Sequence, residues 1–484
     1  MRAIVIGSTK HLLFALFYSI IGTFIALIML AVWLLNEKPE LSIWHTTHLK
    51  NEYHQQSGLN DFTEYLNLED MLFKEVDKKI YQKYQPEIAS PVNRYEKGSL
   101  SDPSLWHSDW NRSFEWENDD AEFGLLLIHG MSDSPYSMSH IAEHYRHQAH
   151  IVGLRLPGHG TIPSGLTDIT WPDLAGVVSL ATTHLSQKLK GKPLYVIGFS
   201  TGAALALNHE LEAITLNKPS SYNKMIFMSP AIGLTPIAQG AYWQAMLGEL
   251  LGQEKLYWNS VETEYDPFKY MSFAVNAGDV VYQLTLRNQQ LLKQLNAEQL
   301  QAIAPIQTFQ SIIDDTVSSV HVVDELYQYL PENDHELVMF DYNRSSNFRL
   351  LMNQDPMLPF EPYWTNQPID YRLTFIESYQ QDGRAVRARE VGLLADQAPQ
   401  ELLLSWPKGV FSLSHIALPF PIEDSLYGPI VVENSETVQI GLAIFQAERG
   451  LFSMSAANML RQKWNPFYPY MLGRMDAFMA QTED

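Results

Sequence analysis

A serine flanked by glycines is the first feature of the sequence that suggests chemistry. The run Gly198-Phe199-Ser200-Thr201-Gly202 has the pattern G-x-S-x-G, with an apolar stretch at 194–197 before it and a helix-like stretch at 203–207 after it. This context predicts a sharp turn from a strand into a helix, with the Ser200 hydroxyl exposed above a sheet. The glycines would admit close neighbouring chains, and the helix N-terminus would add positive partial charge. Ser200 is the candidate nucleophile; an ordinary glycine-rich turn is the alternative.

A serine is a weak nucleophile at neutral pH, so it needs a histidine base and an acid that orients the base. The acid is expected after a later strand, and 305–311 followed by Asp314 and Asp315 supplies such a place. Three histidines follow it. His321 would lie on a helix, and His335 opens a strand at the edge of the sheet opposite the turn. His415 lies in the apolar loop 411–419, and we favour it as the base.

The elements that would position these residues alternate between two kinds. Short apolar runs, typical of buried strands, occur at 125–128, 151–154, 194–197, 225–228, 305–309 and 336–340. Helix-like stretches lie near 137–148, 171–190, 201–215 and 316–330, the second opened by Thr170 and Asp173 as a capping box. This alternation predicts an α/β fold, with a mostly parallel sheet covered by helices on both faces.

Specific loops of the sequence resemble a known family. The run 126–135 (LLIHGMSDSP) is similar to the first strand and oxyanion loop of α/β-hydrolases. The run 156–161 (LPGHGT) resembles a loop of their monoacylglycerol lipase and serine aminopeptidase-like branch. The likeness covers about 123–235 well and 304–341 moderately, and 411–420 by its motif. It implies the α/β-hydrolase fold, with a Ser-Asp-His triad and an acyl-enzyme intermediate.

The resemblance also assigns roles to single residues. It implies that the backbone N–H groups of Met131 and Thr201 form the oxyanion hole, where negative charge develops on the carbonyl oxygen. Its register selects Asp314 over Asp315 as the acid, and it supports His415 as the base. The two loop histidines His129 and His159 are assigned to loop structure, not to catalysis. No metal or organic cofactor is implied.

Two stretches interrupt the alternation and are interpreted as insertions in a hydrolase domain at 121–484. The first, about 231–303, is helical and aromatic and would form a cap. Its Trp243, Trp258, Phe268 and Phe273 would line an acyl-chain pocket or simply attach the cap to the body. The second, about 342–410, appears irregular and is dotted with Pro and Asn. The aromatic run 464–470 is expected to pack a final helix onto the sheet.

The N-terminal part has a different character. Residues 12–35 carry no charged side chain, and this run is long enough to cross a bilayer as a helix. We interpret it as an uncleaved signal anchor after a cytoplasmic stub, 1–11; a cleaved signal peptide and a buried helix are the alternatives. Flanking charges weakly favour a cytoplasmic N-terminus and an exported catalytic domain, periplasmic or otherwise extracytoplasmic.

Residues 36–120 form a predicted helical connecting region. Within it, 61–84 has the periodicity of an amphipathic helix that begins with Asp61 and Glu64 as a capping box. This helix is expected to dock on the hydrolase body, with a free stalk as the alternative. The acidic residues Glu115, Glu117, Asp119, Asp120 and Glu122 are interpreted as a solvated loop.

Composition narrows the function further. The chain has 484 residues and a formal charge of −22, so it repels phosphate backbones, and nucleic acid is not an expected partner. It has no cysteine, which excludes disulfides and thiol catalysis. We therefore expect a membrane-anchored serine esterase acting on carboxylic esters, including lipids or lysophospholipids. A peptidase or an acyltransferase with the same triad, or a non-catalytic binding protein on this fold, are the alternatives.

Overall fold

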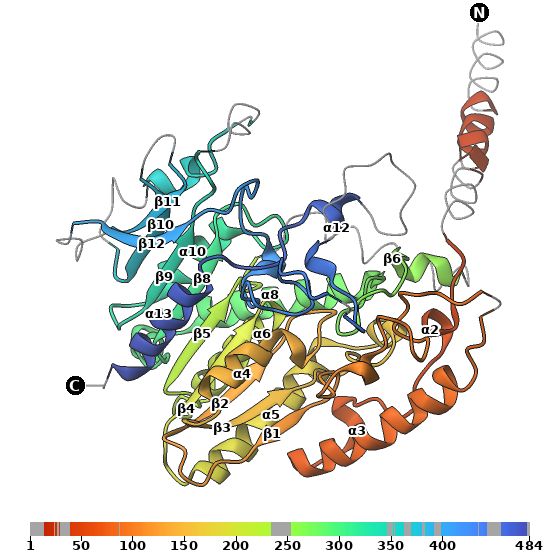
Figure 1. Ribbon diagram of the computed structural model, residues 1–484, viewed down its shortest axis with the longest axis horizontal. Helices are drawn as coiled ribbons and strands as arrows, with labels where there is room; N and C mark the ends of the chain where they lie inside the picture. The colour runs from red at the N-terminus through yellow and green to blue at the C-terminus, as the bar shows by residue number, and fades with distance from the viewer. Residues whose placement is uncertain are drawn as a thin grey trace, which may run out of the picture.

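The computed structural model describes residues 39–86, 88–233, 253–345, 354–362, 369–379, 383–391, 398–433, 435–442 and 456–481, together with 14–23 and a few isolated positions. Its centre is a ten-stranded sheet in the order β1-β3-β2-β4-β5-β8-β9-β10-β11-β12 (Figure 1). All neighbours from β3 to β10 pair in parallel, whereas the pairs β1–β3, β10–β11 and β11–β12 are antiparallel. The expected mostly parallel α/β sheet is confirmed.

The six strands expected from the sequence form the middle of this sheet. They are β2 (Phe123–Ile128), β3 (Ala149–Leu154), β4 (Leu194–Phe199), β5 (Lys224–Met228), β8 (Ile306–Ser311) and β9 (Glu336–Phe340). Every residue of each of them is buried. The mostly apolar character of the strands follows from this burial, because a parallel sheet covered on both faces leaves no strand side to solvent. Strand β8 is the exception, since four of its six buried residues are polar.

Helices cover both faces of the sheet. One face carries α5 (Trp171–Leu189), α6 (Thr201–Thr215), α8 (Val275–Gln294) and α10 (Ser319–Glu325), whose apolar side chains share one core with alternate strand residues such as Leu126 and Val152. The other face carries α4 (Ser139–Tyr145) and α13 (Tyr468–Ala480), which pack on Leu125 and Ile151. The aromatic run at 464–470 therefore leads a final helix onto the sheet, as expected. The capping box at Thr170 and Asp173 is also present.

The insertion 342–410 differs from the irregular segment expected. It carries β10 (Arg372–Ser378), β11 (Ala385–Val391) and β12 (Gln400–Ser405), which extend the central sheet beyond β9. Arg387 and Arg389 on β11 both pair with Glu377 on β10. These charges lie on one face of a hairpin whose other face is apolar. The segment therefore has no continuous apolar run that would indicate a strand in the sequence.

The described part of the insertion 231–303 contains α8, the short helix α9 (Ala297–Gln301), and the strands β6 (Trp258–Ser260) and β7 (Phe273–Ala274). Trp258 is buried in the main core, and Phe268 stacks on Tyr136 with ring centroids 4.4 Å apart. Phe273 packs against the same core as Trp258. These three rings attach the cap to the body, which supports the second of the two interpretations. Trp243 lies outside the described residues.

The connecting region is docked on the body and contributes to the sheet. Helix α3 (Phe62–Val76) ends earlier than expected, in a π-helical turn, Asp77–Tyr81. Asp61 caps the helix by accepting from the Glu64 N–H. The Glu64 carboxylate accepts from the Asn60 N–H and not from the Asp61 N–H, so the expected capping box is not formed. Strand β1 (Phe114–Trp116) pairs with β3, so the sheet begins before the boundary placed at 121.

A buried ion-pair cluster fixes the connecting region to the body. Arg155, which follows β3, donates to Glu69 on α3 at 2.8 Å and to Glu52 at 3.1 Å. All three side chains are almost fully buried. The Tyr65 hydroxyl donates to the Arg155 carbonyl at 2.8 Å. These contacts exclude a free stalk.

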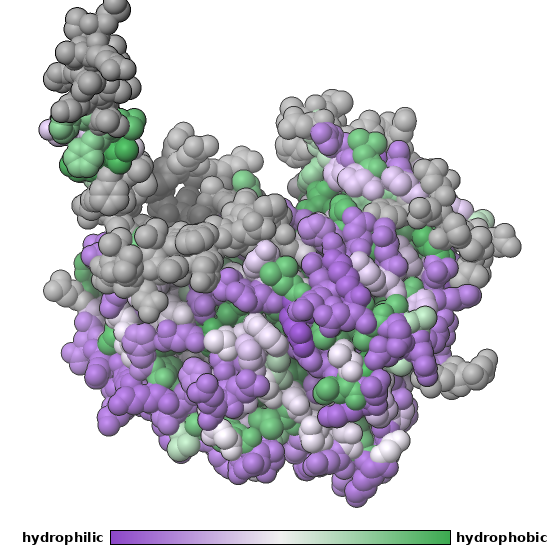
Figure 2. Space-filling model, turned by 180° about the vertical axis from the view of Figure 1, so that it is seen from behind, coloured by the Kyte–Doolittle hydropathy of each residue, from purple (hydrophilic) through white to green (hydrophobic). Residues whose placement is uncertain are grey.

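Residues 14–23 form a helix that projects from the body, with exposed apolar side chains such as Phe17 and Ile20 (Figure 2). The remainder of the expected anchor, 12–35, lies outside the described residues apart from isolated positions. Among the helices of the described residues, none has both the length and the apolar character needed to span a bilayer.

Candidate active site

Ser200 occupies the turn between β4 and α6. Its backbone has φ +54° and ψ −113°, a conformation that a residue with a side chain adopts only under strain. The turn is held on both sides: the Ser200 N–H donates to the Met228 carbonyl at 2.9 Å, and the Ser200 carbonyl accepts from the Ala231 N–H at 3.1 Å. The strained turn at Ser200 is therefore built into the carboxyl edge of the sheet.

The two glycines of the motif are required by close approach. A Cβ on Gly198 would lie 2.5 Å from the Ala203 nitrogen, in the first turn of α6. A Cβ on Gly202 would overlap the carbonyl oxygen of Ile128, at the end of the neighbouring β2. Any larger residue would therefore push the turn away from the sheet.

His415 and Asp314 are brought together across 101 residues of chain. The distance between His415 Nδ1 and Asp314 Oδ2 is 2.8 Å, and both side chains are buried. The other oxygen, Asp314 Oδ1, accepts from the N–H groups of Thr316 at 2.9 Å and Val317 at 3.1 Å. Burial raises the pKa of Asp314, but His415 and these N–H groups outweigh it, so the pKa lies below its usual value.

An ionised Asp314 fixes the histidine tautomer. A carboxylate only accepts hydrogen bonds, so His415 Nδ1 carries the proton and Nε2 is left as the acceptor. The His415 ring lies 5.2 Å from the ring of Phe199, the residue before Ser200. Ser200 and His415 share no hydrogen bond in this structure, and such bonds are often long in a ligand-free enzyme.

The rejected alternatives lie elsewhere. Asp315 is exposed, and His415 bonds to its neighbour Asp314 instead. His335 precedes β9 at the opposite edge of the sheet, where its Nδ1 accepts from the Ile306 N–H at 3.0 Å. Burial lowers the pKa of His335 to about 4, so it is a neutral structural acceptor. His321 is on α10, where it lies against Gly233.

The loop after β2 runs directly beside Ser200. A Cβ built on Gly130 would lie 3.2 Å from the Ser200 Cβ. The N–H groups of Met131 and Thr201 have no hydrogen-bond acceptor among the described residues. Two free N–H groups beside the serine provide the donors that an oxyanion hole requires.

The loop histidines have structural partners. His129 Nε2 accepts from the Leu156 N–H at 3.0 Å, so its Nδ1 carries the proton, which it donates to the Gly130 carbonyl at 2.8 Å. Burial and the nearby His159 hold the pKa of His129 well below its usual value. His159 Nδ1 lies 2.8 Å from the Pro157 carbonyl, and burial lowers its pKa to about 3. Both rings thus stabilise the loops around Ser200.

Two features near Ser200 have no counterpart among the expected residues. Gln310, next to last on β8, donates to Asp314 Oδ2 at 3.2 Å. Lys269 of the cap forms an ion pair with Asp133, in the loop that follows Gly130. Gln310 was detectable as a polar residue inside a buried strand, whereas nothing local in the sequence joins Lys269 to Asp133.

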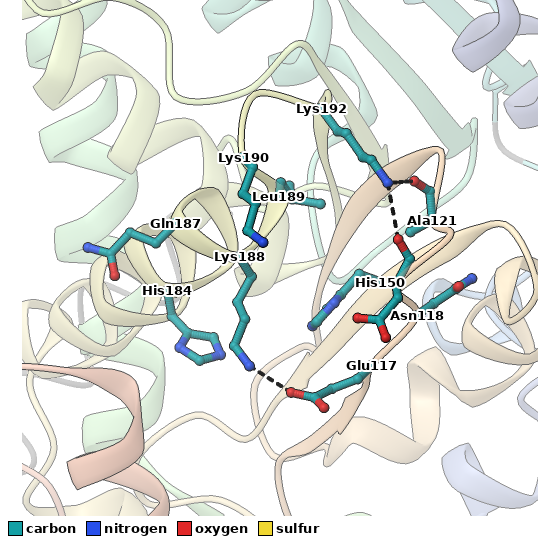
Figure 3. Close-up of a pocket in the computed structure, with 11 residues that line it drawn as sticks. Glu117, Asn118, Ala121, His150, His184, Gln187, Lys188, Leu189, Lys190 and Lys192 are labelled. Atoms are coloured by element: carbon teal, nitrogen blue, oxygen red, sulfur yellow. Dashed lines mark hydrogen bonds and ion pairs between the residues drawn. The ribbon is translucent and has the colours of Figure 1, made fainter.

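A hollow lies at the opposite, amino edge of the sheet (Figure 3). There Lys188 pairs with Glu117 at 2.6 Å, and Lys192 donates to the Ala121 carbonyl at 2.5 Å (Figure 3). Glu115 is not in a solvated loop as expected: it is part of β1 and accepts from two histidines. These are His150, at 2.8 Å, and His184, at 2.9 Å.

Two histidines that line this hollow, His150 and His184, are held in ion pairs with Glu115. Burial raises the pKa of Glu115, but its two histidine partners outweigh this and lower it to about 2. Within the described ranges, no group of three or more His, Asp or Glu side chains is arranged to hold a metal ion. The carboxyl edge around Ser200 is therefore the candidate active site.

The chain is similar to known proteins in sequence and in fold. The model of the alpha/beta hydrolase family matches residues 125–397, more than half of the chain. The chain belongs to the alpha/beta hydrolase family. The thermostable monoacylglycerol lipase of Bacillus sp. (strain H-257) is 35% identical over 85 residues, which are 17% of this chain and 33% of that relative. The match thus spans a third of the relative's length.

Solved structures with a similar fold include other hydrolases. One comes from a study of LipS and LipT, two metagenome-derived lipolytic enzymes. It is 18% identical to this chain with a TM-score of 0.37, and the alignment covers 50% of this chain and 94% of that one. Another is a soluble variant of the monoglyceride lipase from Saccharomyces cerevisiae, 16% identical with a TM-score of 0.37, covering 47% and 82%.

Proposed function

We propose that this alpha/beta hydrolase is a serine hydrolase that cleaves carboxylic esters, including lipid esters. One observation carries the proposal: the buried Asp314–His415 pair leaves His415 Nε2 free as an acceptor at the sheet edge where the strained Ser200 turn lies. A nucleophile, a base and an orienting acid in the chain order Ser, Asp, His are what acyl transfer requires.

The reaction would proceed in two steps. Ser200 Oγ attacks the ester carbonyl while His415 Nε2 takes its proton, and the N–H groups of Met131 and Thr201 stabilise the oxyanion. His415 then returns the proton to the leaving alcohol as the C–O bond breaks, which leaves an acyl group on Ser200. Water, deprotonated by His415, attacks the acyl group and releases the acid, and Ser200 recovers its proton.

A fluorophosphonate probe tests the nucleophile. Wild-type protein should be labelled at one site, and Ser200→Ala should lose both labelling and ester turnover, because only oxyanion and binding effects remain. Ser229→Ala is a matched control, since Ser229 also has a positive φ and lies at the end of β5, on the same sheet edge. Labelling that survives Ser200→Ala would refute the assignment.

A substrate panel then separates ester hydrolysis from its alternatives. We expect turnover of p-nitrophenyl esters of increasing chain length and little turnover of aminoacyl amides. Faster cleavage of the amides would instead identify a peptidase, and labelling of Ser200 without turnover of any ester or amide would favour a binding protein.

We also propose that residues 12–35 anchor the enzyme in a membrane, with the N-terminus in the cytoplasm and the catalytic domain outside it, in the periplasm of a Gram-negative source. The support is the uncharged run itself and the apolar surface of its helical residues 14–23. Protease added to spheroplasts should digest the domain and leave a small membrane-embedded fragment. Full protection would reverse the topology. A mature chain that begins beyond residue 35 would identify a cleaved signal peptide.

A further inference from the structure

A segment near the C-terminus runs alongside the histidine loop. Residues 461–467 connect α12 (Ala456–Leu460) to α13 (Figure 1). The Ser414 hydroxyl, next to His415, donates to the Gln462 carbonyl, and the Asn465 N–H donates to the Phe420 carbonyl at 2.8 Å. The backbone of this segment therefore lies beside the loop that carries His415.

Two cations of this segment have no carboxylate partner within the part of the chain that the structure describes. Lys463 is 6% exposed, and among the described residues its Nζ has one acceptor, the Arg461 carbonyl at 3.3 Å. Arg461 Nη2 donates to the Thr316 hydroxyl at 2.6 Å, and the Thr316 N–H in turn binds Asp314. A buried ammonium group with one neutral acceptor is costly unless a ligand completes its hydrogen bonds.

The groups facing Lys463 do not supply that partner. Burial and Arg461 lower the pKa of Lys463 to about 8, and Asp266 of the cap opposes this from beyond ion-pair distance. Asp266 already accepts from the Tyr427 hydroxyl and from two backbone N–H groups, those of Phe268 and Lys269. Its hydrogen-bonding capacity is thus largely used, and two N–H groups of Lys463 have no acceptor among the described residues.

The position relative to His415 identifies which part of a substrate would meet these cations. In the proposed reaction His415 protonates the leaving alcohol, so the alcohol portion of the ester lies on the His415 side of Ser200. The chain as a whole carries a charge of −22, which repels anions over long range. An anionic substrate would therefore depend on local cations for its binding.

We propose that Lys463 and Arg461 bind an anionic group, a phosphate or a carboxylate, on the alcohol portion of the ester. The inference rests on the proposed ester hydrolysis and specifies its substrate class: acyl esters whose leaving alcohol is charged. Arg461 supplies a planar fork that suits two oxygens, and Lys463 supplies a point charge. The anion is bound and released unchanged, because only the ester C–O bond breaks and the acyl group alone moves to Ser200.

Matched substrates test this assignment. The kcat/KM values for decanoylglycerol, decanoylglycerol phosphate and the decanoyl ester of glyceric acid are measured with purified full-length protein in detergent. These esters share the acyl chain and differ in the charge of the alcohol. We expect the wild type to prefer at least one charged ester, and the two charged esters distinguish a phosphate from a carboxylate.

Variants then locate the anion. Lys463→Met keeps the length of the side chain and removes its charge, and it should lower the ratio of charged to neutral kcat/KM about 10- to 100-fold, the effect of a hydrogen bond to a charged group. Lys463→Arg should restore much of the ratio. Lys188→Met, which removes a cation at the opposite sheet edge, should leave the ratio unchanged. Labelling of Ser200 by the fluorophosphonate confirms that each variant is folded.

The outcomes separate this inference from the function on which it rests. If Ser200 is labelled and neutral esters are cleaved but charged esters are not preferred, the anion site is wrong and the hydrolase stands. An unchanged ratio in folded Lys463→Met also refutes it. If the wild type cleaves no ester and Ser200 is not labelled, the proposed function fails and the anion site fails with it.

Discussion

Replacing Asp314 by asparagine is the sharpest test of the proposed triad. Asp314 accepts four hydrogen bonds, two on each oxygen. An asparagine can keep the two from Thr316 and Val317 with its carbonyl oxygen. Its NH₂ group then faces His415 Nδ1 as a donor, in place of an acceptor. The imidazole must move its proton to Nε2, the atom that has to accept the proton of Ser200.

The size of the effect follows from this tautomer. A histidine with Nε2 protonated cannot act as the base, and the same substitution in the trypsin triad costs about 10⁴ in kcat. We therefore expect kcat of Asp314→Asn to fall by about 10³ to 10⁴, or roughly 4–5.5 kcal/mol of barrier. Steady-state hydrolysis of p-nitrophenyl butyrate measures the loss, and circular dichroism checks the fold.

Asp315→Asn is the matched control. Asp315 is adjacent in sequence, but it is exposed and has no hydrogen bond through its side chain among the described residues. This variant should keep most of the wild-type kcat. An equal loss in the two variants, or a larger one in Asp315→Asn, would show that the acid is not Asp314.

Three further predictions concern stability. Gly202→Ala should destabilise the fold by about 3 kcal/mol in thermal unfolding and weaken probe labelling, because the added Cβ overlaps the Ile128 carbonyl. Gly473→Ala is the control: it lies in α13 with open space around it, and the substitution should be neutral or stabilising. Burial raises the pKa of Glu264 from 4.5 to about 7. Between these values the folded protein holds a proton that the unfolded chain releases. The free energy of unfolding should therefore fall by roughly 3 kcal/mol as the pH rises from 5 to 8. Urea titrations of Glu264→Gln should show a smaller loss over that range; an unchanged pH dependence would contradict the argument. Arg155→Met should cost about 3–5 kcal/mol in urea unfolding, because two buried carboxylates lose their cation, and a cost under 1 kcal/mol would contradict the ion-pair role.

The parts of the fold that the sequence predicts well are those where one local pattern has one structural meaning. Buried parallel strands such as β4 are continuous apolar runs, and G-x-S-x-G between a strand and a helix needs its glycines for steric reasons. Contacts between distant segments leave no such local trace. The run Arg461-Gln462-Lys463 looks like an exposed polar stretch, yet Lys463 is buried beside the histidine loop.

The insertion before His415 shows why the long separation from Asp314 does not disturb their contact. The chain leaves the sheet after β9 and returns beside its point of departure, where the Asn343 N–H donates to the Phe411 carbonyl at 2.7 Å and its side chain donates to the Val410 carbonyl at 2.8 Å. The Ser311 hydroxyl, at the end of β8, donates to the Leu413 carbonyl at 3.1 Å. These bonds hold both ends of the excursion at the carboxyl edge of the sheet.

The cost of closing a loop grows only with the logarithm of its length, so strands β10 to β12 can be added between the two ends at little expense. They also bury apolar residues such as Phe375 and Ile376 against the sheet, which stabilises the added segment itself. The position of His415 is therefore determined by the bonds at Ser311 and Asn343, two short contacts at the base of the insertion, and not by the length of the chain between the acid and the base.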